Sequence, residues 1–285
     1  MTVYASGLKW GEGPRWQNGA LWVSDTQGSR LWTDAGGKWT AFETSSVSNG
    51  LWFLPDGRLV AAMMHEKRIG VWTGAQWDTY ADLSSLSPGP LGDLVGDRNG
   101  NLYVDDVAYS AANGEQPRPG RLLFVGSDRA SRVVADDLHF PNGLAFTEGE
   151  RTLVVAETSA QRLTSFRVDV GGDLHERRHV ADIAALLGPN ARPDGIWAGE
   201  EGIWVATLAG HAVGLVRDGK LLTTVDTGTG FPIACCVAEG SRLFVTIAAA
   251  RDQPLMAAIA SKTVTTDVIV YDVRDLVRAS PFASS

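Results

Sequence analysis

Residues 99–106 read NGNLYVDD, a tight Asn-Gly turn followed directly by a run of aromatic, β-branched and acidic residues. This pattern is typical of the turn and second strand of a β-hairpin. It occurs five more times, at residues 18–25 (NGALWVSD), 56–63 (DGRLVAAM), 149–158 (GERTLVVAET), 201–208 (EGIWVATL) and 239–248 (EGSRLFVTIA). The sequence therefore contains six copies of one structural unit.

Each copy has room for four strands. A short apolar strand precedes the turn, as in residues 50–53 (GLWF) and 143–146 (GLAF), and two more strands follow it, as in residues 162–168 and 177–181. Units about 40 to 50 residues apart are typical of propeller blades. We predict an all-β fold, a six-bladed β-propeller of four-stranded antiparallel blades, forming a single domain over residues 1–285. Residues 180–187 are the one helix-like stretch and fall between blades.

The last unit is one strand short. Its third strand is predicted at residues 267–273 (DVIVYDV), and no fourth strand follows. Residues 2–5 can supply it, so that an N-terminal strand joins the last blade and closes the ring. Closure in this way removes edges that an open sheet would expose.

Composition limits the possible partners. The formal net charge is −8 and the Lys and Arg residues form no cluster, which argues against nucleic acid because phosphate binding needs a basic surface. The N-terminus lacks the pattern of a signal peptide, and no stretch approaches the roughly 20 apolar residues that span a bilayer. We expect a cytoplasmic protein, a monomer or small homo-oligomer, that acts on a small molecule.

Six equivalent positions are expected to meet at one mouth of the central channel. Counting back about seven or eight residues from each turn glycine reaches Glu12, Asn49, Gly92, Asn142, Asp194 and Pro232. Carboxylates crowded together raise each other's pKa unless a cation compensates them. Carboxylate and amide oxygens suit Ca²⁺, Mg²⁺ or Mn²⁺. The sequence therefore predicts one divalent metal ion bound by Glu12, Asn142 and Asp194.

Turn sequences offer a structural alternative for these residues, since Pro-Asn-Gly and Pro-Asp-Gly are common turns. Residues 55–57 (PDG) lead directly into a strand and form such a turn, whereas residues 141–143 (PNG) and 193–195 (PDG) stand half a hairpin earlier. For Asn49 both interpretations remain open. His65, Tyr109 and His139 follow strands or precede the mouth, where they either line the pocket or belong to ordinary loops.

With these residues assembled, the chain resembles the SMP-30/gluconolactonase family along nearly its whole length. The matching segments are EGP at residues 12–14 with LWVSD, Asp93-Leu94 with LYVDD, FPNG at residues 140–143 with LVVAET, PDG at residues 193–195, and LFVTIA. The resemblance implies a propeller that hydrolyses lactones with one bound cation, with Glu12, Asn142 and Asp194 at the metal-ligand positions. Ca²⁺ is the expected ion, with Mg²⁺, Mn²⁺, Zn²⁺ or iron as alternatives.

The site residues receive roles on this basis. Asp194 is predicted to orient or deprotonate the attacking water. The candidate substrate-binding residues are Asn49, His65, Asp93, Tyr109 and His139.

One departure from the family concerns the substrate. Sugar-lactone members usually carry Asn before the Asp of the third blade and Arg two residues earlier, whereas this chain has Gly92 and Pro90. We therefore expect a lactone or ester less polar than a sugar-acid lactone. The alternatives are a phosphotriesterase-like hydrolase and a non-catalytic propeller that serves as a binding scaffold. A serine hydrolase is disfavoured because the G-x-S-x-G motif is absent.

Overall fold

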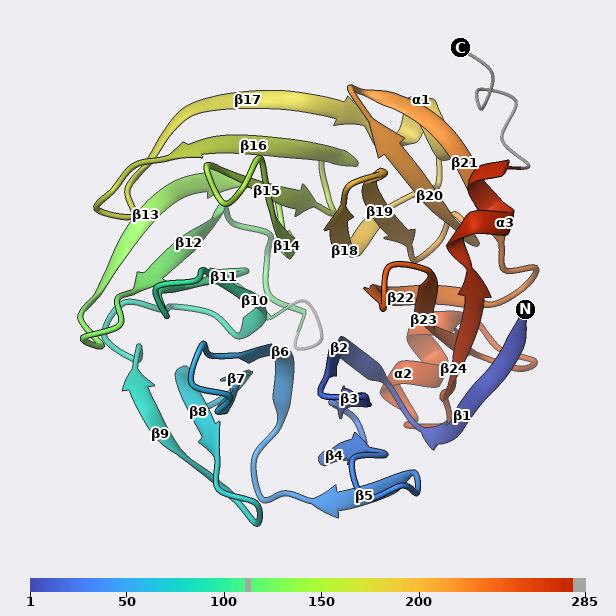
Figure 1. The fold of residues 1–285 in the computed structure, drawn as a ribbon, viewed down its shortest axis with the longest axis horizontal. Coiled ribbons are helices and arrows are strands. Elements are labelled where there is room, and N and C mark those ends of the chain that lie inside the picture. Colours follow the sequence, from blue (N-terminus) through green and yellow to red (C-terminus); the bar gives the residue numbers. More distant parts are fainter. Residues whose placement is uncertain (111–113, 279–285) are drawn as a thin grey trace.

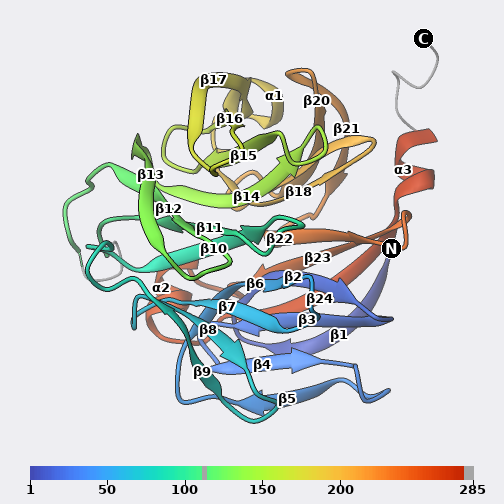
Figure 2. The same ribbon diagram turned by 60° about the vertical axis from the view of Figure 1, so that its left-hand side comes forward.

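The computed structural model describes residues 1–110 and 114–278 and confirms the six-bladed β-propeller (Figures 1 and 2). Six antiparallel four-stranded sheets surround one central axis, with the first strand of each blade innermost. Blade 1 consists of β2 (Gly11–Gln17), β3 (Ala20–Asp25), β4 (Arg30–Thr33) and β5 (Thr40–Glu43). Blade 2 consists of β6 (Ser48–Phe53), β7 (Leu59–Met63), β8 (Arg68–Trp72) and β9 (Trp77–Asp82). Blade 3 consists of β10 (Leu91–Gly96), β11 (Leu102–Asp106), β12 (Gly120–Val125) and β13 (Ser131–Leu138). Blade 4 consists of β14 (Pro141–Thr147), β15 (Thr152–Glu157), β16 (Arg162–Val168) and β17 (Leu174–Asp182). Blade 5 consists of β18 (Pro193–Gly199), β19 (Gly202–Thr207), β20 (Ala212–Arg217) and β21 (Lys220–Asp226).

Blade 6 joins the two ends of the chain, as predicted. It consists of β22 (Phe231–Ala238), β23 (Arg242–Ala249), β24 (Thr265–Asp272) and, outermost, the N-terminal strand β1 (Thr2–Leu8). Thr2 pairs with Val270 and Leu8 with Thr266. The third strand starts and ends slightly earlier than predicted, because Val273 begins the helix α3 (Val273–Arg278).

The predicted helix at residues 180–187 is only partly correct. Residues 180–182 continue β17, and the helix α1 (Ile183–Leu187) begins where the Asp182 carboxylate accepts a hydrogen bond from the Ala185 N–H at 2.9 Å. A further helix, α2 (Leu255–Ala260), was not predicted and lies in the connection between β23 and β24. In the described part of the chain, no helix is long and apolar enough to cross a membrane.

Apolar clusters between adjacent blades form the core. Trp204, fully buried, packs with Cys235 between blades 5 and 6, whereas Cys236 packs with Phe244 on the opposite face of the same sheet. The two cysteines thus point to opposite faces, as alternation along a strand requires. Both are free and buried, so they pack as small apolar residues.

Glycines allow the inner strands to approach one another closely. A Cβ atom on Gly143 would lie 2.4 Å from the backbone oxygen of Asp194, and one on Gly195 would lie 2.6 Å from the Cβ of Ala234. No side chain fits at such distances, so backbone packs directly on the next blade. Asn142 and Asp194 immediately precede these glycines, which therefore determine how near the two side chains come to the axis.

Removing residues 1–6 should lower the melting temperature markedly, because blade 6 would lose its outer strand and expose the edge of β24. Circular dichroism during heating measures the effect. Val3→Ala, at an exposed position of the same strand, is the control and should change the free energy of unfolding by less than about 0.5 kcal/mol. An unchanged melting temperature after the deletion would show that closure does not stabilise the ring.

Candidate functional site

Every inner strand is irregular next to its mouth position. The pairing of the first strand with the second shifts between Glu12 and Arg15, between Pro141 and Leu144, and between Pro193 and Ile196, and the same irregularity occurs in the other three blades. Such bulges bend a strand and redirect its side chains. The six positions predicted from sequence define what we call the channel mouth.

Glu12, Asn142 and Asp194 lie together at this mouth. Asn142 donates a hydrogen bond to the Asp194 carboxylate, and the charges of Asp194 and Glu12 act on one another. Burial, reinforced by the charge of Asp93 and opposed by the Asn142 hydrogen bond, raises the pKa of Asp194 to about 7. Burial and then the charge of Asp194 raise the pKa of Glu12 well above its usual range, although the Trp10 indole donates to its Oε1 at 2.8 Å.

Thr158 links two of these residues, and sequence reasoning missed its role. Its hydroxyl donates to the backbone oxygen of Pro193 at 2.7 Å and accepts a hydrogen bond from Asn142 Nδ2 at 3.3 Å. Asn142 is therefore held against the residue that precedes Asp194. Thr158 ends the fourth repeat, LVVAET, which was its only signal in the sequence.

Asp93 is engaged on both of its oxygens within the protein. Oδ1 accepts from the Leu94 N–H at 2.8 Å and from the guanidinium of Arg15 at 3.4 Å, and Oδ2 accepts from the Leu144 N–H at 3.3 Å. These contacts join three inner strands. The predicted contact of Asp93 with substrate stays a prediction, and its described contacts are structural.

Arg15 is a second residue that sequence reasoning missed. Its side chain is buried, and its guanidinium lies over the rings of Trp52 and Trp197, at 5.3 and 5.7 Å from their centroids. These three residues also line a cavity of about 110 Å³ together with Phe146. The sequence signal for Arg15 was its position as a charged residue within a strand that is buried on both faces.

Gly92 leaves room for the Asp105 carboxylate. Asp105 is completely buried, and its two oxygens accept from the Gly92 N–H at 2.8 Å and the Asp93 N–H at 2.9 Å. A Cβ atom on residue 92 would lie 2.4 Å from Asp105 Oδ1. The space that a side chain at residue 92 would need is thus occupied by the Asp105 carboxylate, which fixes the bulge of β10.

The remaining predicted substrate-binding residues lie in different surroundings. Asn49 is buried, 8% exposed, and its side chain makes no hydrogen bond to residues 1–110 or 114–278. Tyr109 is buried and packs edge-to-face on Phe140, with ring centroids 5.8 Å apart. His65 is exposed and lines a hollow of about 180 Å³ that also includes Pro90. Their contacts with substrate stay predictions.

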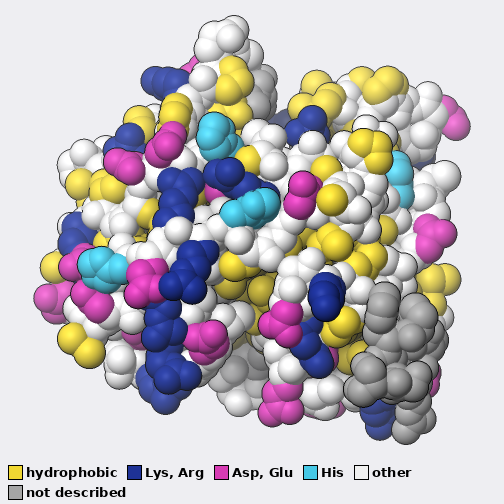
Figure 3. Space-filling view, turned by 90° about the horizontal axis from the view of Figure 1, so that it is seen from above, with side chains coloured by type: hydrophobic (Ala, Val, Ile, Leu, Met, Phe, Trp, Pro, Cys, Tyr) yellow, Lys and Arg dark blue, Asp and Glu magenta, His cyan; other side chains and the backbone are white. Residues whose placement is uncertain are grey.

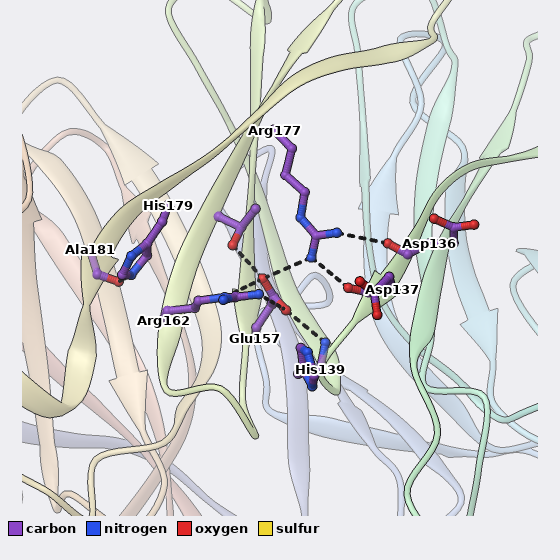
Figure 4. A network of polar contacts seen from close by, with 9 residues as sticks. Asp136, Asp137, His139, Glu157, Arg162, Arg177, His179 and Ala181 are labelled. Atoms are coloured by element: carbon purple, nitrogen blue, oxygen red, sulfur yellow. Dashed lines mark hydrogen bonds and ion pairs between the residues drawn. The ribbon is translucent and has the colours of Figure 1, made fainter.

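His139 is exposed, and its backbone is tethered to a buried carboxylate (Figure 4). Its N–H donates to Glu157 Oε2 at 2.8 Å, while Arg162 donates to both oxygens of Glu157 at 2.8 and 3.0 Å. Arg177 lies 3.6 Å from the same carboxylate. Glu157 therefore fixes the segment that leads into β14 and Asn142.

The same device recurs at the ends of other second strands. Asp25 accepts from the Trp10 N–H at 2.9 Å, and Asp106 accepts from the Gly89 N–H at 3.1 Å. Asp25, Asp106 and Glu157 are the acidic residues near or at the end of three sequence repeats. The repeat thus encodes the carboxylates that hold the segments entering the mouth.

A much larger hollow, about 800 Å³, lies between the outer parts of blades 4 and 5 (Figure 3). Apolar residues such as Val154 and Ile203 line it together with charged residues. Two of its four acids pair with arginines, Glu148 with Arg167 and Glu176 with Arg178, in both cases within 3 Å. The other two, Glu200 and Asp218, are exposed to solvent. The channel mouth, where carboxylates shielded from solvent converge, is therefore the candidate site.

The mouth residues fit a hard divalent cation. Among residues 1–110 and 114–278, no group of three or more His, Cys, Asp and Glu side chains could hold a metal ion. The candidate set contains two carboxylates and one amide, all of which offer oxygen ligands. Within the described part of the chain, the carboxylates of Glu12 and Asp194, whose pKa values are raised, have no basic side chain as a partner, which is the environment that a cation would stabilise.

Comparison with known proteins identifies the family. Residues 10–249 match the SMP-30/Gluconolactonase/LRE-like region. The chain belongs to the SMP-30/gluconolactonase family. This result confirms the resemblance found in the sequence.

Solved structures of similar fold cover nearly the whole chain. A luciferin-regenerating enzyme is 20% identical with a TM-score of 0.77, covering 94% of this chain and 92% of its own. A gluconolactonase from Xanthomonas campestris is 23% identical with a TM-score of 0.73, covering 94% and 89%. Regucalcin from Agrobacterium tumefaciens, described as a calcium-binding protein, is 20% identical with a TM-score of 0.75, covering 95% of both chains.

Curated relatives match over shorter segments. Adipocyte plasma membrane-associated protein Hemomucin of Drosophila melanogaster is 33% identical over 110 residues, which are 38% of this chain and 17% of that protein. Protein STRICTOSIDINE SYNTHASE-LIKE 13 of Arabidopsis thaliana is 31% identical over 123 residues, 40% of this chain and 29% of that protein. This SMP-30/gluconolactonase family member thus matches less than a third of either relative.

The Gly92–Asp105 contact predicts a strong coupling between the two positions. Gly92→Ala should destabilise the protein by about 1–3 kcal/mol, because the new Cβ collides with a buried carboxylate. Asp105→Ala should then lower the free energy of unfolding less in the Gly92→Ala protein than in the wild type. A double-mutant cycle in urea measures the coupling, expected at about 0.5–3 kcal/mol. Additive effects would contradict the contact.

The raised pKa of Asp194 predicts that the metal-free protein loses stability as the pH rises. Its folded-state pKa of about 7 exceeds the value of about 3.9 for an unfolded chain. The contribution of protonated Asp194 to the free energy of unfolding is therefore complete below about pH 4 and is lost as the pH rises through about 7.

Melting temperatures in EDTA and in CaCl₂, at about pH 5 and about pH 8, measure this effect. The stabilisation by Ca²⁺ should be larger at the higher pH, where protons no longer compete for the carboxylates. Asp194→Asn should reduce that difference. Equal stabilisation by Ca²⁺ at both pH values in the wild type would contradict the prediction.

Proposed function

We propose that the protein is a metal-dependent hydrolase that opens a lactone less polar than a sugar-acid lactone. The observation that carries the proposal is the pair of carboxylates, Glu12 and Asp194, held at the channel mouth with raised pKa values and with no basic partner among residues 1–110 and 114–278. A scaffold that only binds a partner has no need for such a pair. The family and the names of the solved relatives, a gluconolactonase and a calcium-binding regucalcin, support the same function.

The chain supplies oxygen ligands and a proton acceptor. Glu12, Asn142 and Asp194 would hold the ion, which would act as a Lewis acid on the lactone carbonyl. We assign Asp194 to orient the attacking water and accept its proton, because it is the buried carboxylate that also contacts Asn142. Water adds to the carbonyl carbon, the ring C–O bond breaks, and the leaving alkoxide takes up a proton to give the hydroxy acid.

Other residues position the reactants. Thr158 holds Asn142, and Trp10 holds Glu12, each through one hydrogen bond. The Asn49 amide, buried and without a hydrogen bond to the described residues, is available to a substrate oxygen. At residue 92, the backbone N–H is already bound to Asp105 and there is no side chain, which removes one polar contact for a hydroxylated substrate.

The expected activity is hydrolysis of aliphatic γ-lactones in the presence of Ca²⁺, Mg²⁺, Mn²⁺, Zn²⁺ or Fe²⁺, abolished by EDTA. Asp194→Ala should lower kcat/KM by about 10²- to 10⁴-fold, the usual effect of losing an acid–base group. Asp78→Ala, at an exposed position of the outer strand β9, is the control and should leave kcat/KM unchanged. Initial rates from a pH indicator measure each reaction.

Two comparisons test the substrate class. Faster hydrolysis of glucono-δ-lactone than of aliphatic lactones would contradict the preference for less polar rings. Hydrolysis of paraoxon with no lactone activity would favour the phosphotriesterase alternative. Absence of both activities with every metal would favour a non-catalytic scaffold.

A further inference from the structure

The channel mouth is polar at four of its six positions, with Glu12, Asn49, Asn142 and Asp194 in blades 1, 2, 4 and 5. In blade 6, Pro232 stands at the position equivalent to Asn142. Leu208 follows β19 in blade 5 as Thr158 follows β15 in blade 4. Pro232 and Leu208 are therefore apolar residues at positions that carry polar side chains in blade 4.

Further apolar side chains lie beside Pro232 and Leu208. Trp10, Leu208, Phe231 and Leu255 pack, partly buried, against one cluster that includes Ile233, Ala234, Ala248, Ala250, Ala258 and Val264. The cluster joins the connection before β2, the end of β19, the start of β22 and the helix α2. Because each of the four packing side chains keeps some exposed surface, together they offer an apolar wall beside the mouth.

This wall contacts one candidate metal ligand, Glu12, directly. The Trp10 indole donates to Glu12 Oε1 at 2.8 Å, and the Trp10 backbone N–H is held by Asp25. On the other side, the Phe231 ring lies against His211 with centroids 4.7 Å apart, and His211 Nδ1 is 2.8 Å from the Gly230 oxygen. The rings are thus fixed before any ligand binds, which favours a preformed subsite.

We propose that Trp10, Leu208 and Phe231 form a binding subsite for the alkyl chain of a substituted lactone. This inference rests on the proposed function, since it places the lactone carbonyl at Glu12, Asn142 and Asp194. The alkyl chain then extends over the apolar wall, while the Asn49 amide, which makes no hydrogen bond to the described residues, faces the ring oxygens. The substrate class is an amphiphilic lactone with a linear apolar substituent.

Chain length tests the subsite. Each methylene that leaves water on the wall should improve kcat/KM or Kd by up to about fourfold. One series consists of γ-lactones whose side chains grow from none to six carbons, measured as kcat/KM with the metal-loaded protein. A second series consists of the matching γ-lactams, which keep the ring carbonyl but resist hydrolysis, measured as Kd by calorimetry.

Variants locate the effect. Phe231→Ala and Leu208→Ala should each flatten the dependence on chain length in both series. Phe42→Ala is the matched control, since Phe42 is also partly buried and packs edge-to-face on Trp72 in the outer part of the ring. It should keep the wild-type dependence. Trp10→Phe keeps an aromatic ring but loses the hydrogen bond to Glu12, so it should lower kcat for every lactone while the chain-length dependence remains.

The outcomes separate this inference from the proposed function. Lactones hydrolysed at rates independent of chain length, or a dependence that survives in both Phe231→Ala and Leu208→Ala, would overturn the subsite. Lactam affinity that rises with chain length and falls in these variants, without hydrolysis of any lactone, would support the subsite and overturn the proposed function. If Phe231→Ala does not fold, the milder Leu208→Ala decides the question on its own.

Discussion

The close packing of inner strands around the axis determines most other features of this structure. Gly143 lies against the backbone of Asp194, and Gly195 against Ala234, at distances that exclude any side chain. The residues before these glycines are then placed at the mouth whatever their chemistry. Asn142 and Asp194 lie close together because of backbone packing. Their side chains determine only the chemistry that is possible at this place. The same framework can therefore carry amides, carboxylates, glycine or proline at equivalent positions.

Crowding carboxylates at one mouth is electrostatically unfavourable, and the protein compensates them unequally. Asp93 receives hydrogen bonds from Arg15 and two backbone N–H groups, and Asp105 receives two from the backbone. Glu12 has one indole donor, and Asp194 has one amide donor. Buried charges are normally paired with an opposite charge or a metal. Among the described residues, Glu12 and Asp194 are thus the mouth carboxylates without a compensating positive charge. Local electrostatics therefore indicate the same two residues as the sequence repeat.

Sequence reasoning succeeded where the chain repeats itself. The period of the hairpins predicted six blades, and the missing strand of the last unit predicted closure by β1. The register of that period selected Glu12, Asn142 and Asp194, whose role as metal ligands stays a prediction. Arg15, Thr158 and Asp105 escaped because their roles arise from contacts with other blades or with a bulge, which no local pattern encodes. The helix α2 was missed because an insertion of this length departs from the repeat on which the prediction depended.

Gly92 shows why a difference from the family pattern needs a structure for its interpretation. From the sequence, this glycine is the loss of a polar side chain that would contact substrate. In the structure, the space is occupied by the Asp105 carboxylate, which binds the N–H groups of Gly92 and Asp93 and fixes the bulge between them. A polar group is therefore still present at this point of the mouth, but both of its oxygens bind the backbone. Because a Cβ at position 92 and a carboxylate at position 105 exclude each other, a polar side chain can return to position 92 only if residue 105 also changes.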